Sequence, residues 1–171
     1  LAEATGGFSA SMRIGGGGSC VVYRAELFGM RVAVKALTDV AGMEEGAKAA
    51  EEKQFVAEQK LLMRVFHPNI CRLLGVSADG RQRCLVLELC PAGSLFDVLK
   101  ADKDNRKKGK EANSEEEAVV FGWQQRVEVA VAVARALVHL HSEKPPLIHR
   151  DVKTQNVSRT ILLSVVDHDI L

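Results

Sequence analysis

Residues that could do chemistry gather most densely in the octapeptide HRDVKTQN, which runs from His149 to Asn156. This string places a carboxylate, an ammonium group and a carboxamide close together, on Asp151, Lys153 and Asn156. An amide oxygen suits a hard cation such as Mg²⁺, and a lysine can neutralise charge on a phosphoryl group. The string is typical of the centre of a phosphoryl-transfer site. On its own it also fits an ordinary polar loop.

A second candidate lies near the amino terminus, in the glycine-rich string IGGGGSCVVY from Ile14 to Tyr23. Glycines between two strands let backbone N–H groups approach phosphate oxygens without obstruction by Cβ atoms. VAVK ends at Lys35, which could hold the phosphates as a point charge, and Glu58 on the next helix could orient that lysine. Taken separately, these residues also fit a flexible turn, a solvent-facing lysine and a surface helix residue.

The elements that must position the glycines and Lys35 are predicted from hydrophobic periodicity. Residues 14–40 alternate apolar with polar, which predicts two strands that turn at Phe28-Gly29-Met30. The polar, Ala-rich residues 41–53 suit a loop that leads into a helix. That helix should run to His67-Pro68, because the residue before proline disfavours the α region.

Two more strands are predicted over residues 69–76 and 83–90, and the character of the chain changes after them. SLFDVLK, at 94–100, predicts a short helix. The charge run 101–117 has nothing to bury, so we expect a solvated loop or disordered insertion there.

The Ala/Val-rich segment from Trp123 to His141 predicts a long helix in front of the octapeptide. Its apolar residues cover most of the circumference, so we expect it to be buried, with Leu137, Val138 and Leu140 in the core. Strands with one helix followed by helices predict an α+β lobe and then a mainly helical one.

Length and composition restrict the classes of function. The chain has 171 residues, of which 47% are hydrophobic and 26% charged, as in a globular domain or two small lobes. A net charge of +1 gives no support to nucleic-acid binding. The cysteines show no CxxC spacing, so we expect reduced thiols in a cytoplasmic protein and no zinc site. No apolar run approaches the roughly 20 residues that span a bilayer.

Several motifs, in order and at compatible spacings, resemble the signature of eukaryotic protein kinases: G-x-G-x-x-G-x-V, V-A-I-K, H-R-D-x-K-x-x-N and D-F-G. The corresponding strings are GGGGSCVV (15–22), VAVK (32–35), HPNICRLLG (67–75), the hinge-like LVLELCPAGSL (85–95) and HRDVKTQN (149–156). The opening ATGGFSASMRIGGGGSCVVYRAEL resembles the tyrosine-kinase-like group, which includes receptor-like and interleukin-receptor-associated kinases. The resemblance covers about residues 8–157.

The resemblance implies a two-lobe α+β protein-kinase fold. Its parts are an N-terminal flank (1–13), an N-lobe of antiparallel sheet plus one helix (14–90), a partial helical C-lobe (91–157) and a divergent tail (158–171). It also implies ATP and Mg²⁺ as cofactors, and a protein as substrate. The lysine two residues after Asp151 is similar to that of serine/threonine kinases, which transfer the γ-phosphate to a Ser or Thr hydroxyl.

The resemblance also assigns roles to residues of the octapeptide. Asp151 would orient the proton of the attacking hydroxyl, and Lys153 would neutralise charge on the transferred group. Asn156 is similar to the second magnesium ligand. His149 would be a packing and hydrogen-bonding residue, and Arg150 would pair with a phosphate on an activation loop.

In the N-lobe, Lys35 and Glu58 would form the pair that holds the phosphates. The residues that the resemblance assigns to the nucleotide site are Ile14, Gly15, Gly17, Val22, Ala33, Lys35, Glu88 and Cys90. The backbone of Glu88 and Cys90 would bond the purine beside a gatekeeper, Leu87.

Two departures from the family pattern bear on activity. Cys20 stands at the third glycine, where a Cβ costs about 1–2 kcal/mol if positive φ is needed; the residue could place a thiol near the phosphates or be a small buried hydrophobe. After Asn156 the chain reads VSRTILLSVVDHDIL in place of D-F-G, and we interpret Asp167 as accidental.

We therefore expect a kinase fragment that ends before D-F-G and is inactive as given. It could be the cytosolic part of a membrane receptor. The alternative is a pseudokinase-like ATP-binding or scaffolding module without catalysis.

Overall fold

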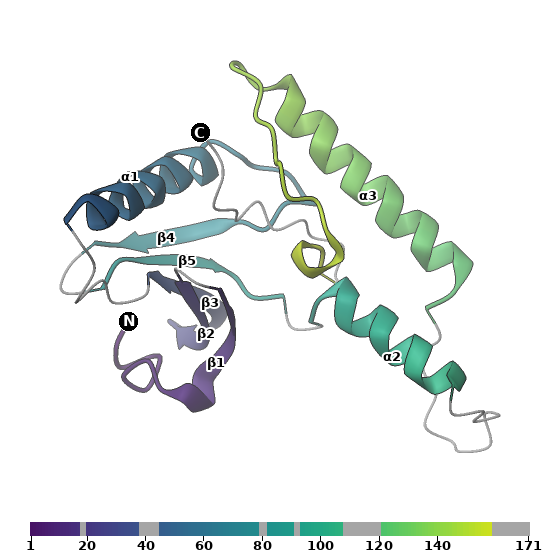
Figure 1. The fold of residues 1–171 in the computed structure, drawn as a ribbon, viewed down its shortest axis with the longest axis horizontal. Helices are drawn as coiled ribbons and strands as arrows, with labels where there is room; N and C mark the ends of the chain where they lie inside the picture. Colours follow the sequence, from purple (N-terminus) through teal and green to yellow (C-terminus); the bar gives the residue numbers. More distant parts are fainter. Residues whose placement is uncertain (18–19, 38–44, 79–81, 91–92, 108–120, 159–171) are drawn as a thin grey trace. The chain divides into compact units, whose positions relative to one another are not determined.

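The computed structural model describes the chain except for residues 18–19, 38–44, 79–81, 91–92, 108–120 and 159–171 (Figure 1). The described residues fall into two compact units. Leu1–Phe66 and Cys71–Leu89 form the first, and His67–Ile70 with the chain from Cys90 onward form the second.

An antiparallel sheet of five strands is the frame of the first unit, with the order β1-β2-β3-β5-β4. The strands are β1 (Arg13–Gly16), β2 (Cys20–Leu27), β3 (Met30–Leu37), β4 (Leu73–Ser77) and β5 (Cys84–Glu88). The predicted hairpin is confirmed, because β2 and β3 pair up to Leu27 opposite Met30. Its two-residue turn, Phe28-Gly29, has positive φ at both positions (52° and 75°), as a type I′ turn requires.

One hydrophobic cluster of this unit lies on one face of the sheet. Because side chains alternate along a strand, every second residue of β2, β3 and β5 contributes to it. The buried residues are Tyr23, Ala25, Val32, Val34, Ala36, Cys84 and Val86.

The N-terminal segment, residues 1–12, packs on this core through Leu1, Ala4, Phe8 and Met12. It ends in a short 3-10 helix, η1 (Ala10–Met12). The ring of Phe8 meets that of Tyr23 edge-on, with centroids 5.5 Å apart. The predicted flank is therefore a packed part of the sheet's core.

Thr5 fixes the conformation of the N-terminal segment from inside. Its side chain is fully buried, and Oγ1 donates to the Leu1 carbonyl (2.9 Å) and accepts from the Phe8 N–H (3.1 Å). These bonds hold a tight reversal in which Gly6, Gly7 and Phe8 all have positive φ.

The helix α1 (Glu45–Leu62) begins earlier than predicted and also ends earlier. The expected loop over 41–53 is wrong from Glu45 onward, because Ala, Glu and Lys are strong helix formers even without an apolar face; residues 41–44 lie outside the described part. The helix ends five residues before His67, so that Val65 can be buried and the ring of Phe66 can lie 4.9 Å from the Arg72 guanidinium.

In the second unit, α2 (Leu95–Lys107) is longer than the predicted short helix. The expectation of a solvated loop is therefore wrong for residues 101–107, and residues 108–117 lie outside the described part. Two hydrogen bonds between Ser94 and Asp97 cap the start of the helix. Ser94 Oγ accepts the Asp97 N–H (3.2 Å), and Asp97 Oδ2 accepts from Ser94 Oγ (2.6 Å). The second half gains a partner, because Asp102 pairs with Arg126 at 3.1 Å.

The predicted long helix is α3 (Trp123–Ser142), but among the residues that the structure describes only one of its faces is buried. The buried residues follow helical spacing and are Val129, Ala132, Ala136 and Leu140. The core prediction is thus correct for Leu140 and wrong for Val138, which is 69% exposed; Leu137 is half-buried. Trp123 is 80% exposed.

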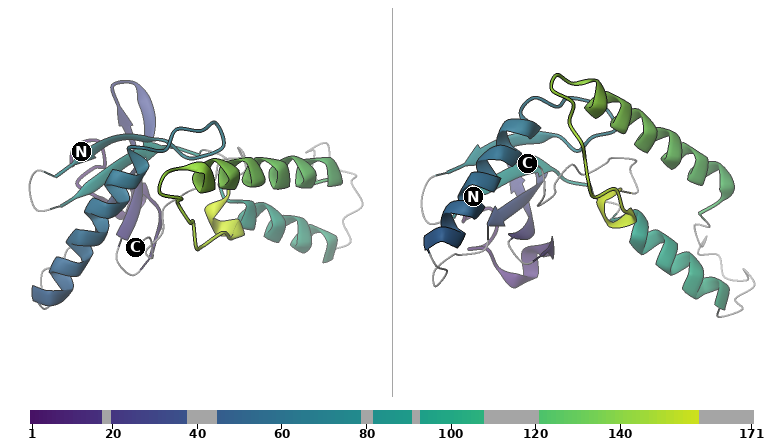
Figure 2. Two further views of the ribbon diagram at one scale, coloured as in Figure 1. Left: turned by 90° about the horizontal axis from the view of Figure 1, so that it is seen from above. Right: turned by 45° about the horizontal axis from the view of Figure 1, so that its top comes forward.

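The octapeptide follows α3 and is tied to the beginning of α2. Its last three residues form a 3-10 turn, η2 (Thr154–Asn156), which lies beside the start of α2 in both views of Figure 2. Leu95 donates its N–H to the Val157 carbonyl (2.8 Å), and Ser94 pairs with Ser158. Within the described residues, no helix combines the length and apolarity needed to cross a membrane.

Candidate functional site

The first group of candidate residues is an ion pair between β3 and α1. Lys35 Nζ lies 3.0 Å and 2.9 Å from the two carboxylate oxygens of Glu58, and both residues are buried. Lys35 stands in the central strand, opposite Val22 on one side and Leu85 on the other. The structure therefore brings together two residues that are 23 positions apart in the sequence and that the motifs had paired.

The sheet register gathers further predicted residues around Lys35. Gly15 pairs with Val22, which pairs with Lys35, while Ala33 pairs with Leu87. By strand alternation, all five lie on the face opposite the buried core. Ala33 and Leu87 are buried there, while Ile14, on β1, is 49% exposed.

The glycine string closes tightly between β1 and β2. Gly17 donates its N–H to the Cys20 carbonyl at 2.9 Å. Gly16 has φ of +149°, and a Cβ at that position would lie 2.7 Å from the same carbonyl oxygen. Only glycine fits at Gly16 without a backbone shift. Sequence reasoning chose Gly15 and Gly17 and missed this position, because a run of identical glycines carries no signal to distinguish them.

Cys20 is the first residue of β2 and is 6% exposed. It is absent from the described residues with positive φ, so its Cβ does not incur the predicted backbone cost. Of the two interpretations, the small buried hydrophobe agrees with the structure.

Of the two residues whose backbone was predicted to bond the purine, Glu88 already has partners within the chain. The Glu88 N–H donates to the Arg72 carbonyl (2.9 Å), and the Glu88 carbonyl accepts from the Cys71 thiol (3.4 Å). A carbonyl oxygen has two lone pairs, so this one retains capacity for another donor. Cys90, in the second unit, is half-buried.

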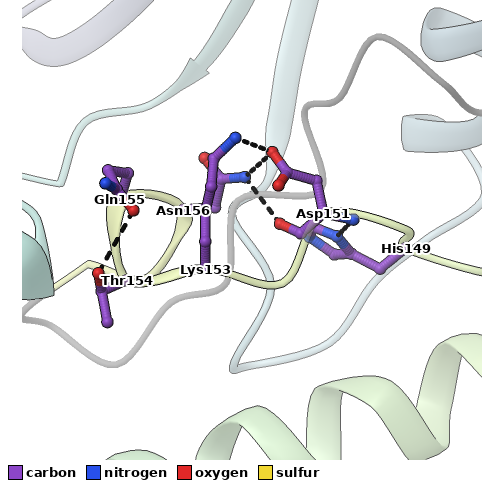
Figure 3. A network of polar contacts seen from close by, with 6 residues as sticks. All are labelled: His149, Asp151, Lys153, Thr154, Gln155 and Asn156. Atoms are coloured by element: carbon purple, nitrogen blue, oxygen red, sulfur yellow. Dashed lines mark hydrogen bonds and ion pairs between the residues drawn. The ribbon is translucent and has the colours of Figure 1, made fainter.

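The second group of candidate residues is the octapeptide, in which the side chains of Lys153 and Asn156 converge on Asp151 (Figure 3). Asn156 Nδ2 donates to the Asp151 carbonyl and to Oδ2, both at 2.9 Å. Lys153 Nζ forms an ion pair with the same Oδ2. The η2 turn makes this possible, because it returns the chain so that Asn156 faces a residue five positions earlier.

His149 supports this loop from inside. It is 2% exposed, and its Nδ1 and carbonyl accept the Asp151 N–H at 3.3 Å and 2.8 Å. The predicted packing and hydrogen-bonding role is confirmed. Arg150 lies between them with φ of 62°, a left-handed conformation that costs a non-glycine residue about 1–2 kcal/mol. Such strain persists where the surrounding contacts impose it, as the flanking bonds do here.

The donor set around Asn156 agrees with a weakly held hard cation. Its amide nitrogen is bound to Asp151, which leaves the amide oxygen on the other side of the planar group. Magnesium is commonly held by one or two protein oxygens together with phosphates and water. The described residues contain no cluster of three His, Cys, Asp or Glu side chains able to hold a metal by themselves. Asp167 lies outside those residues.

Comparison with known proteins adds independent evidence. A family model described as protein tyrosine and serine/threonine kinase matches residues 8–165. The chain belongs to the protein kinase family. Its fold class, a kinase N-lobe with part of a C-lobe, agrees with the prediction, and members of the family use ATP and Mg²⁺.

Curated relatives of this kinase chain include plant receptor kinases. It is 38% identical over 159 residues to the brassinosteroid LRR receptor kinase BRI1 of Oryza sativa, covering 92% of the chain and 12% of that protein. It is 35% identical over 171 residues to the serine/threonine-protein kinase CDG1 of Arabidopsis thaliana, covering 99% of the chain and 34% of that protein. The chain thus spans a small part of the length of these relatives, and the predicted resemblance to receptor-like kinases is confirmed.

Proposed function

We propose that this chain carries the ATP-holding residues and catalytic loop of a protein serine/threonine kinase, an enzyme that transfers the γ-phosphate of ATP to a protein hydroxyl. The buried, bidentate Lys35–Glu58 pair carries this proposal. A structural lysine at a strand centre is normally exposed, whereas this one is 5% exposed and held by a carboxylate from another element.

The phosphates of ATP fit the face of the sheet on which Lys35 lies. Its ammonium supplies a positive charge, and Glu58 keeps that charge in one place. Gly15 and Gly16 bring backbone close to the same face without side chains. The apolar side chains of Val22, Ala33 and Ile14 would cover the adenine ring, with Glu88 and Cys90 beside it.

In the catalytic loop, Asp151 orients the acceptor hydroxyl and receives its proton. Its carboxylate is held by Asn156 and Lys153, so it needs little reorganisation during the reaction. Lys153 is half-exposed and close enough to Asp151 to neutralise charge on the phosphoryl group as it passes. Mg²⁺, which Asn156 would help to hold through its amide oxygen, supplies charge neutralisation on the phosphate oxygens.

A second candidate function is ATP binding without transfer. The observations that favour it are Cys20, which stands where the family pattern has its third glycine, and the string VSRTILLSVVDHDIL, which stands after Asn156 in place of D-F-G. In that case the chain would act by nucleotide-dependent contact with partners.

Two measurements on the same protein separate these functions. Thermal unfolding with and without Mg-ATP should show stabilisation by nucleotide, and Lys35→Met should abolish it. Transfer of labelled γ-phosphate to a Ser/Thr-rich protein should then be measured for this chain and for a longer form that includes the carboxyl half of the kinase domain, each with and without Asp151→Asn. Transfer that disappears in Asp151→Asn supports the kinase. Nucleotide stabilisation without transfer supports the binding module, and absence of both contradicts the proposal.

The protein substrate and the cytoplasmic location follow from the same proposal. ATP is available on the cytosolic side, and several relatives are named receptor kinases. We therefore propose that the chain acts on a cytosolic protein.

A further inference from the structure

Two histidines to which the motifs assign no catalytic role meet in the second unit. The ring of His67 stacks on that of His139, with centroids 5.0 Å apart and planes inclined by 26°. His67 begins the short segment His67–Ile70, and His139 lies in the last turn of α3. The stack therefore attaches this segment to the helix.

The hydrogen bonds of His67 require its neutral form. Nδ1 accepts the Asn69 N–H at 3.1 Å, so the proton of the neutral ring lies on Nε2. The His67 carbonyl also accepts the Ile70 N–H at 3.0 Å, and Ile70 is 3% exposed. A proton added at Nδ1 would break the bond to Asn69 and turn an acceptor into a second donor facing it.

The groups that face His67 oppose a positive charge. On its own segment the ring meets the neutral Asn69 N–H, and from α3 it meets His139 and the cation of Arg135. His139 Nε2 is buried and has no hydrogen-bond partner among the described residues. The neighbouring ring therefore brings no acceptor that would stabilise a positive charge on His67. Burial first, then the charges of His139 and Arg135, hold the pKa of His67 below its ordinary value of 6.5.

We propose that the His67–His139 stack is a pH-sensitive contact, in which protonation of His67 releases the segment His67–Ile70 from α3. The folded form binds this proton less readily than the unfolded chain does. The contact is therefore complete above about pH 6.5 and is lost as the pH falls through the lower, folded pKa. An inert stack would instead keep its geometry over this range.

The test follows the histidine ring signals and the backbone amides of the chain by NMR between about pH 7.5 and pH 5. The pKa of His67 should lie below its ordinary value of 6.5. The protection of the Asn69 and Ile70 amides against exchange should fall along the His67 titration, by up to about tenfold per pH unit. Amide protection that stays constant while His67 titrates would overturn the proposal.

Matched variants identify the cause. His139→Phe keeps a ring for stacking but removes its charge, so His67 should titrate closer to 6.5. His141→Phe, on an exposed position of the same helix, should leave His67 unchanged. Should His139→Phe fail to fold, Arg135→Gln at an exposed position should move the pKa of His67 in the same upward direction. Equal effects of the His139 and His141 variants would contradict the proposal.

Discussion

Asn156 holds Asp151 at two points, because its Nδ2 lies 2.9 Å from both the carbonyl and the Oδ2 of that residue. One amide group thus fixes the backbone and the carboxylate of the proposed catalytic residue together. Its predicted role as a metal ligand uses the other atom of the same amide, so the two roles are compatible.

Replacement of Asn156 by Ala should therefore loosen Asp151 as well as weaken metal binding. Hydrogen bonds to a charged group contribute about 1.5–3 kcal/mol, so unfolding should become easier by about that amount. Gln155→Ala, at the exposed neighbouring position, should change stability by less than about 0.5 kcal/mol. Urea denaturation of both variants measures the difference. Similar midpoints would show that the two hydrogen bonds from Asn156 to Asp151 do not stabilise the fold.

The losses in the free energy of unfolding on substitution of Lys35 and Glu58 should be strongly non-additive. Either Lys35→Met or Glu58→Leu leaves a buried charge without its partner, and each should cost about 3–5 kcal/mol. The double variant removes both charges and should be more stable than the sum of the single losses predicts. A double-mutant cycle by chemical denaturation gives this coupling, and additive losses would show that the pair is not mutually dependent.

Adjacent glycines should respond very differently to alanine. Gly16→Ala places a Cβ 2.7 Å from a backbone oxygen at positive φ, whereas in Gly15→Ala the new Cβ is 4.0 Å from Val22 Cβ. We expect Gly16→Ala to lower stability by about 1–3 kcal/mol and to weaken nucleotide binding. Gly15→Ala should be close to the natural protein in thermal unfolding. A larger loss of stability in Gly15→Ala than in Gly16→Ala would contradict the close approach of Gly16 to the Cys20 carbonyl.

Thr5→Val should detach the N-terminal segment from the sheet. Valine preserves the shape of the side chain but leaves the Phe8 N–H without its acceptor and removes the hydroxyl donor to the Leu1 and Ala2 carbonyls. The expected loss is about 1–3 kcal/mol. Ser11→Ala is the control, since Ser11 is exposed and bonds only near the surface. Tyr23 fluorescence, which reports on contact with Phe8, should change in Thr5→Val alone.

Acid should weaken the start of α2 through Asp97. Hydrogen bonds from the Ser94 side chain and then its backbone hold the pKa of Asp97 below its ordinary value of 3.8. Since the folded pKa is depressed, this stabilisation is present above 3.8 and is lost as the pH falls through the folded pKa. Ser94→Ala should reduce the helix signal's dependence on acid in circular dichroism. Identical acid titration curves for the two proteins would show that the Ser94–Asp97 hydrogen bonds do not stabilise the start of α2.

Local periodicity predicted the hairpin and the long helix, because both depend on residues that are neighbours in the sequence. The same periodicity gave wrong predictions where a helix is stabilised by residues distant in the sequence. Residues 101–107 are helical although they have no apolar face, and Asp102 finds its partner 24 residues later in Arg126. The burial of Val138 was overestimated because composition cannot show which sides of a helix have neighbours.

In the candidate site, residue types were predictable and fine geometry was not. The motifs paired Lys35 with Glu58 and grouped Asp151 with Asn156, and the structure brings each pair together. The demand for glycine at Gly16 depends on where the Cys20 carbonyl lies, which only the folded turn reveals.

The burial of Cys20, Cys71 and Cys84 has a practical consequence, since Cys90 is the only half-buried one among the described thiols. Burial also raises the pKa of Cys84, which keeps its sulfur in the unreactive protonated form. Alkylating reagents should therefore label a native molecule first at Cys90, and at the other three sulfurs only when the sheet opens. The rate at which further labels are added to each molecule would then measure how often this protein unfolds.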